Sequence, residues 1–225
     1  MKSNFFLRLI IFCCVFCVFR AACAAPITET EAASWARDKG RQLLQTFSEP
    51  DLQVRYAKLD EMFLNYVDLD YIAKFVIGKY WRQMTAEQKR RYVPLFKRYA
   101  LAIYKSFPLD FARNVDFVVS GVKPDRKYAD VITEISLAGN TPEEQNGAQA
   151  QKFIVTFRLT RNNGKLQIID LKLTESSLIL SYRSRFYEMI MQDDGELEWF
   201  LEDLELITSS TEETNRQRLS DRQAD

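Results

Sequence analysis

The apolar residues of this chain change their spacing twice, and that change limits the fold more than any other feature. Before Pro108 they recur every three to four positions, which is the period of an amphipathic helix. From residue 116 to residue 173 they alternate with polar residues, which is the period of a strand. After Ser177 the helical period returns. Helices, then strands, then helices predict an α+β domain rather than repeated strand–helix units.

Four helices are expected before Pro108. Thr28 and Glu31 have the spacing of a capping box, and so do Thr85 and Gln88, which precede the most aromatic of the four. Pro94 falls inside that fourth helix and should kink it, because proline removes a backbone donor. A further helix is expected from residue 177, followed by a short acidic one.

Four strands are expected, over residues 116–122, 128–137, 152–161 and 165–173. The last two are joined by Asn162, Asn163 and Gly164, and an Asn-Gly step favours a type I′ hairpin turn. In the second and third strands one set of alternate positions is apolar and the other, which includes Asp130, is polar. We therefore expect helices packed on the apolar side of a curved, four-stranded antiparallel sheet.

The first 24 residues have the three parts of a secretory signal peptide. Lys2 and Arg8 precede a continuous apolar run over residues 9–19, and small residues follow it. The run is shorter than the about 20 residues that span a bilayer. We expect cleavage after Ala24. The alternative is a lipoprotein signal acylated at Cys23, but Arg20 stands where such a signal has leucine.

Cleavage there would change the composition of the chain. All four cysteines lie in the signal, so an exported α+β domain over residues 25–208 would have no disulfide. The signal also carries three of the 31 basic residues, which leaves 28 against 31 acidic ones and a mildly acidic protein without a membrane anchor. Residues 209–225 contain a single apolar recurrence, Leu219, and we expect them to be disordered.

Several kinds of chemistry are excluded by what the sequence lacks. It has no histidine, which removes imidazole bases and nearly all zinc sites. It has neither a glycine-rich phosphate loop nor a Gly-x-Ser-x-Gly motif. The acidic run over residues 193–196 has no calcium-loop spacing and is typical of a helix start. We therefore expect no metal and no cofactor, and the balanced charge argues against a nucleic-acid partner.

An enzymatic alternative rests on two aspartates. Cone-shaped α+β domains include isomerases that use a buried aspartate and a tyrosine. Asp170 lies among apolar neighbours and could be buried, whereas Asp130 falls on the polar face of the sheet. A buried aspartate beside a chain turn more often caps a helix or pairs with a base such as Arg183. We expect no catalysis, and a cone-fold enzyme acting on a small apolar substrate remains the alternative.

The helices before Pro108 carry an unusual number of aromatic residues. The simplest role for such a stripe is packing in the core. However, these helices offer more apolar surface than four short strands can cover, and a cavity between helices and sheet would use the excess. The residues concerned are Phe75, Tyr80, Trp81, Tyr92, Phe96, Tyr99, Tyr104 and Phe107.

Two segments resemble a known family. The first runs Phe75-Val-Ile-Gly-Lys-Tyr-Trp-Arg82 and continues through Thr85 to Gln88; the second includes Ile169-Asp-Leu171 and Ser181-Tyr-Arg-Ser-Arg-Phe186. Together they resemble the MlaC family, also called the toluene-tolerance auxiliary component of ABC transporters, over about residues 35–204. The resemblance implies a cone like that of nuclear transport factor, with a deep apolar pocket for phospholipid tails.

The resemblance also implies a function and partners. A family member is a periplasmic carrier that shuttles phospholipid between an outer-membrane lipoprotein complex and an inner-membrane ABC transporter complex. A binder of hopanoid or other apolar cargo is a variant of this hypothesis, and an interaction module with a filled core is a rival. Because no ATP-binding motif is present, any ATP would be hydrolysed by another subunit.

A set of lipid-binding residues follows from the aromatic helices, the apolar sheet face and the family segment. Arg183 could contact a headgroup phosphate through its planar guanidinium, or pair with Asp170 or Asp116 to fix the C-terminal helix. The expected residues are Phe75, Tyr80, Tyr99, Tyr104, Phe107, Val131, Phe153, Val155, Phe157, Tyr182, Arg183 and Phe186.

Overall fold

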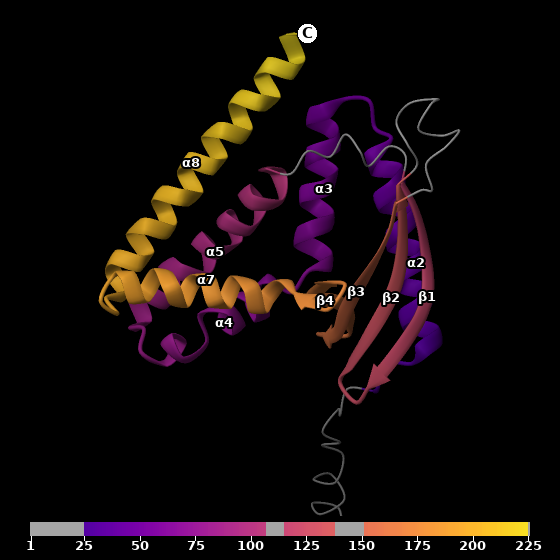
Figure 1. Cartoon of the computed structure of the whole chain (residues 1–225), viewed down its shortest axis with the longest axis horizontal. Coiled ribbons are helices and arrows are strands. Elements are labelled where there is room, and N and C mark those ends of the chain that lie inside the picture. The colour runs from indigo at the N-terminus through magenta and orange to yellow at the C-terminus, as the bar shows by residue number, and fades with distance from the viewer. Residues whose placement is uncertain (1–24, 107–114, 138–150, 225) are drawn as a thin grey trace, which may run out of the picture.

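The computed structural model describes residues 25–106, 115–137 and 151–224, and shows an α+β fold with an open antiparallel sheet. The predicted export signal, Phe107 and the expected loop over residues 139–149 lie outside these ranges. The elements form two regions, seen at the right and the left of Figure 1. We call α2, α3 and the sheet the sheet half, and the remaining helices the helical half.

Within the described residues the sheet has five strands rather than the four predicted. They are β1 (Val115–Asp125), β2 (Tyr128–Leu137), β3 (Gln151–Asn162), β4 (Lys165–Leu173) and β5 (Ser176–Ser177), paired in that order and antiparallel throughout. The short fifth strand forms because the chain turns back at Thr174, whose φ is 57°, and pairs with β4. Asn163 and Gly164 both have positive φ, as the predicted type I′ turn requires.

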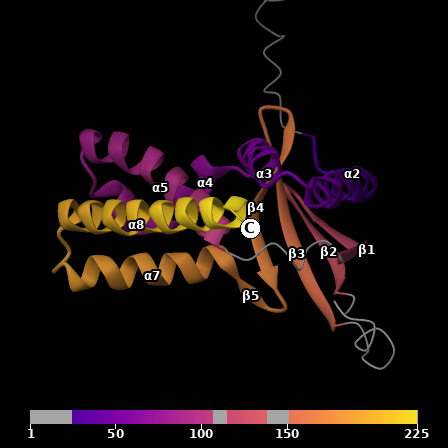
Figure 2. The ribbon, with the colours of Figure 1, turned by 90° about the horizontal axis from the view of Figure 1, so that it is seen from above.

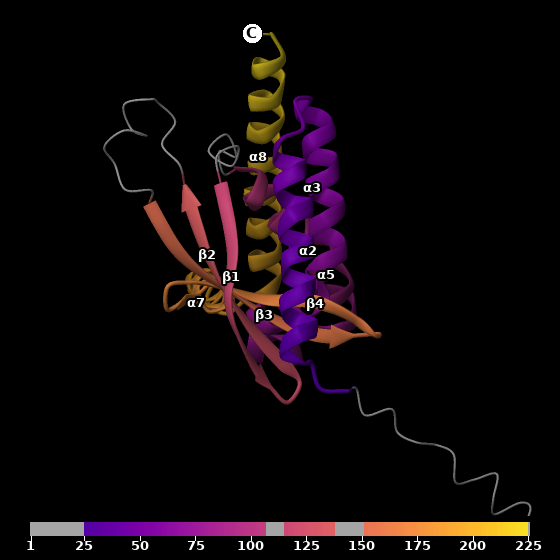
Figure 3. The same cartoon turned by 90° about the vertical axis from the view of Figure 1, so that its right-hand side faces the viewer.

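Two helices, α2 (Glu29–Phe47) and α3 (Leu52–Tyr66), lie side by side along one face of the sheet (Figure 3). Each begins at a side-chain cap: Thr28 accepts from the backbone of Glu31, and Asp51 accepts from that of Val54. Gly40 brings α2 close to β1, since a Cβ at this position would lie 2.5 Å from the Phe117 ring. Glycine is therefore required there by packing.

The helical half contains α4 (Leu69–Ile77), the 3₁₀ turn η2 (Gly78–Arg82), α5 (Ala86–Ser106), α7 (Leu178–Gln192) and α8 (Leu197–Ala224). Both hydrogen bonds of the predicted capping box before α5 are present, between Thr85 and Gln88, and Pro94 lies inside the helix. Seen from above, α8 lies between α5 and α7 (Figure 2). Among the described residues, no helix combines the length and the apolarity that a bilayer span needs.

The C-terminal helix extends further than the sequence suggests. Disorder is expected from residue 209, but α8 continues to Ala224 along α5. Arg98 on α5 binds both Glu205 and Glu212, and the buried side-chain amide of Asn215 donates to the carbonyl of Ala102 at 2.8 Å. These contacts are polar, which is why a search for apolar recurrence does not detect them.

Candidate functional site

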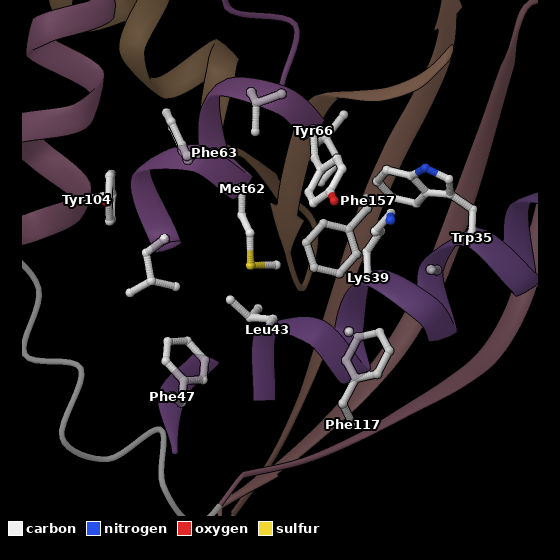
Figure 4. A pocket seen from close by; sticks show the side chains of 15 residues that line it. Trp35, Lys39, Leu43, Phe47, Met62, Phe63, Tyr66, Tyr104, Phe117 and Phe157 are labelled. Carbon is white, nitrogen blue, oxygen red and sulfur yellow. The ribbon is translucent and has the colours of Figure 1, made fainter. Parts of the chain in front are cut away.

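An apolar cavity of about 240 Å³ lies between α2, α3 and the sheet, in the sheet half (Figure 4). Its wall comes from every layer around it, including the last turn of α5. The lining residues are Trp35, Ala36, Lys39, Gly40, Leu43, Phe47, Leu59, Met62, Phe63, Tyr66, Val67, Tyr104, Phe117, Phe157 and Ile168.

Helical periodicity explains which side chains reach the cavity. On α2 they follow one another at intervals of four, from Trp35 through Lys39 and Leu43 to Phe47, and on α3 they run from Leu59 to Tyr66 along one face. The two stripes face inner positions of the sheet, among them Phe117 and Phe157.

The helix pair contacts the sheet on both sides of the cavity. The close backbone contacts of α2 are with β1 and β2, and those of α3 are with β4. The strand between them, β3, carries Phe157, which therefore meets the cavity instead of a helix backbone. A space remains because two helices rest on opposite sides of a curved surface.

Polar atoms form very little of the cavity wall. Among the described residues that line the cavity, Lys39 is the single charged one, and its Nζ lies 3.0 Å from Asp38 Oδ2 and 4.5 Å from the centre of the Tyr66 ring. The Tyr66 hydroxyl donates to Gln42 Oε1 at 3.1 Å. The part of the wall that the structure describes therefore offers hydrocarbon, aromatic rings and the Met62 sulfur, and no carboxylate for acid–base chemistry.

Tyr104 at the end of α5 closes one side of the cavity. Its ring stacks on Phe63 with centroids 5.0 Å apart, and its hydroxyl donates to Asp60 on α3. The same carboxylate accepts from Lys105 Nζ at 2.6 Å. Burial, with the hydrogen bond to Asp60, raises the pKa of Tyr104 well above its usual range. Tyr104 is neutral at physiological pH and fixes α5 against α3.

Two of the twelve predicted lipid-binding residues, Tyr104 and Phe157, line this cavity. Val155 and Phe153 lie on the same face of β3 as Phe157. Val155 is buried there and Phe153 is exposed. Val131 packs beneath α2. Phe107 lies outside the described residues.

The remaining predicted residues belong to the helical half. Tyr80, Tyr99 and Phe186 are buried in its aromatic core, and the Tyr182 ring packs edge-on against Tyr99. Arg183 lies over the ring of Phe75, 4.9 Å from its centre. These side chains contact one another and are separate from the cavity wall.

The aspartates of the enzymatic alternative have structural partners. Asp130 forms a bidentate ion pair with Arg158: Nε donates to Oδ1 at 2.7 Å and Nη2 donates to Oδ2 at 2.8 Å. This pairing lowers the pKa of Asp130. Buried Asp170 accepts from the Ser177 hydroxyl and from the backbone of Ile179, at the start of α7. Among described residues Arg183 pairs with neither Asp170 nor Asp116, and neither Asp130 nor Asp170 lines the cavity.

Most of the wall comes from residues outside the predicted lipid-binding set. The missed members of α2 and α3 include Trp35, Leu43, Phe47, Phe63 and Tyr66. A signal was present, since both stripes recur at helical spacing and one contains Gly40, whose missing side chain indicates close approach to another layer.

The chain matches the family model described as MlaC protein over residues 40–205. No curated protein sequence matches it. Among solved structures it is similar to the phospholipid-binding protein from Ralstonia solanacearum in complex with a phospholipid, with a TM-score of 0.63. The two proteins are 17% identical, and the likeness covers 80% of this chain and 98% of that one. At this identity the likeness establishes a shared fold.

Proposed function

The chain belongs to the MlaC family, and on that premise we propose that it is a lipid carrier whose apolar cavity holds an acyl chain of a phospholipid. The observation that carries this proposal is the wall itself, which lines a space of about 240 Å³ almost entirely with carbon and sulfur atoms. The similar Ralstonia solanacearum structure contains a phospholipid, which supports the same ligand class.

The size of the cavity indicates how much lipid it takes as it stands. An engineered apolar cavity of about 150 Å³ binds benzene, and pockets for drug-sized ligands measure about 300–1,000 Å³. The space found here therefore suits a segment of one acyl chain. We infer that the rest of the lipid tails lies along the same face of the sheet, where Phe153 and Leu173 are 38% and 51% exposed.

The energetics suit exchange rather than permanent binding. Burying a methylene group stabilises by about 0.8 kcal/mol relative to water, so a lipid tail is held strongly against release into solvent. A bilayer offers the tail a similar environment. Transfer between membrane and cavity is then close to balanced, and its direction is set by the partners.

We propose the periplasm as the location, reached through cleavage after Ala24, and the partners that the family implies: an outer-membrane lipoprotein complex and an inner-membrane ABC transporter complex. N-terminal sequencing of the exported protein tests the cleavage site. The nuclear-transport-factor-like cone stays a prediction. The geometry gives the enzymatic alternative no support, since both of its aspartates lie away from the cavity.

The decisive experiment extracts the purified mature protein with organic solvent and identifies the extract by mass spectrometry. We expect about one phospholipid per protein. Leu43→Trp, which fills the cavity from α2, should reduce the bound lipid several-fold, whereas Leu206→Trp at a position 69% exposed on α8 should not. Absence of lipid from the wild-type protein, or equal lipid in both variants, would contradict the proposal.

A further inference from the structure

A second, polar cavity of about 560 Å³ adjoins the apolar one. It lies between the first half of α2, the end of α3 and the β3–β4 hairpin, which contributes Arg161 and Lys165. The two cavities share three wall residues, namely Trp35, Lys39 and Tyr66. An elongated molecule with an apolar end and a polar end could therefore contact both.

The shared wall is apolar on one side and polar on the other. The rings of Trp35 and Tyr66 meet edge to face, with centroids 6.0 Å apart, and the Lys39 ammonium lies over the Tyr66 ring. Tryptophan and tyrosine combine an apolar body with a polar tip, and lysine keeps its charged head in water above an apolar stem. The three side chains thus form a boundary between hydrocarbon and polar surroundings.

Positive charge predominates in the polar cavity. Its wall contains three cations, Lys39, Arg161 and Lys165, and two acids, Glu31 and Asp38. Arg161 Nη2 binds both carboxylate oxygens of Glu31, at 2.7 and 2.6 Å, and Lys39 pairs with Asp38. Lys165 is exposed and forms no ion pair with any residue that the structure describes.

Arg161 also has an unused donor. Arg161 Nε is buried and has no hydrogen-bond partner within the described part of the chain. Leaving a buried charged donor unpaired costs more than about 1–3 kcal/mol, and a bound acceptor would recover that free energy once the Arg161 side chain turned toward it. The site therefore has a spare cation, Lys165, beside the apolar cavity, and Arg161 holds a further N–H in reserve.

We propose that the polar cavity is a subsite for the phosphodiester of the lipid whose acyl chain occupies the apolar cavity. This inference rests on the proposed function. A phosphodiester carries one negative charge, which matches the excess of one cation, and its oxygens accept from lysine and arginine donors. Phospholipids would then be bound in preference to neutral lipids of equal chain length.

The test compares two single-chain lipids on lipid-stripped protein by calorimetry: palmitoyl lysophosphatidylcholine and monopalmitoylglycerol. The wild-type protein should prefer the phospholipid by about tenfold, the ratio that corresponds to one charge-assisted hydrogen bond. Lys165→Gln should reduce this preference, and Lys39→Gln combined with Lys165→Gln should abolish it. The matched control, Lys79→Gln with Lys89→Gln, removes two charges outside both cavities and should retain it.

The outcomes separate this inference from the carrier proposal. Equal binding of both lipids to the wild-type protein would overturn the phosphodiester subsite while leaving the apolar site in place. Failure of both lipids to bind would overturn the carrier proposal. Glycerophosphocholine has the same phosphodiester without the acyl chain. If it bound as tightly as the lysophospholipid, the ligand would be a free phosphodiester and not a lipid.

Discussion

The two halves of the molecule use aromatic residues in opposite ways. In the helical half Tyr92, Phe186 and Phe200 are fully buried and pack against one another, with ring centroids 5.3–6.3 Å apart where they meet. In the sheet half the rings of the cavity wall, such as Phe63 and Phe117, are only partly buried. Aromatic content therefore does not indicate where a ligand binds. The indicator is aromatic surface that its neighbours leave partly uncovered.

The difference follows from what packs against what. Helices with complementary ridges close on one another and leave little space, as α5, α7 and α8 do. A helix pair on a curved sheet contacts it at separate places, as α2 does near Gly40 and α3 does near β4. The two modes of packing should therefore respond differently to substitution.

The contrast predicts unequal effects of phenylalanine truncation in the lipid-stripped protein. Phe186→Ala should reduce the free energy of unfolding by about 3–5 kcal/mol, because it leaves a void in a closed core. Phe63→Ala should cost about 1–2 kcal/mol, because its ring is only partly buried and faces existing space. Urea unfolding measures both, and equal losses would remove the distinction between the halves.

Gly40 tests how tightly α2 meets the sheet. Gly40→Ala should destabilise by about 1–3 kcal/mol through the clash with Phe117, even though alanine favours an isolated helix by about 1 kcal/mol. Phe117→Ala should be destabilising alone but should relieve the clash in the double variant. A double-mutant cycle in urea without such coupling would show that α2 does not approach β1 this closely.

Tyr99 gives the closed core a pH signature. Burial raises the pKa of Tyr99 to about 12, above the value of about 10 for an exposed tyrosine. Its contribution to stability is complete below pH 10 and is lost as the pH rises through 12, by at most about 1.4 kcal/mol per pH unit. Tyr99→Phe should remove this loss.

The same substitution should cost little at pH 7, since the buried Tyr99 hydroxyl has no hydrogen-bond partner among the residues described. Unfolding midpoints of wild type and Tyr99→Phe at pH 7 and pH 11 provide the measurement. A constant difference between the two proteins across that range would show that folding does not raise the pKa of Tyr99.

The smallest change in stability is expected from substitution near the end of α8. Asn215→Ala should destabilise by about 1 kcal/mol, because the Ala102 carbonyl on α5 loses its side-chain donor. Thr214→Ala, one residue earlier and exposed, should change stability by less than about 0.5 kcal/mol. Equal effects in thermal unfolding would mean that this part of α8 does not pack against α5.

Local chemistry made much of the fold predictable. The Thr28 and Thr85 caps and the Asn163-Gly164 turn act within three or four residues, so the sequence displays them directly. The α+β class follows from the change of apolar period. The two-residue β5 was missed because it has no period of its own, and its pairing depends on the turn at Thr174.

The cavity was predictable as a feature but not in its position. A buried stripe that faces a helix and one that faces open space have the same spacing, so Tyr99 and Tyr104 look alike in the sequence. Only the tertiary arrangement places Tyr99 in the closed core and Tyr104 on the cavity wall. Polar long-range contacts, such as that of Asn215, leave no sequence pattern at all.

Within the described wall, Tyr104 is the one residue that the helical half contributes. In the proposed carrier, cargo would therefore couple to that half through a single ring and its anchor on Asp60. Ligand binding stabilises what it touches, so loading should raise the melting temperature of the sheet half more than that of its neighbour. A single calorimetric transition in the empty protein would then divide into two in the loaded one.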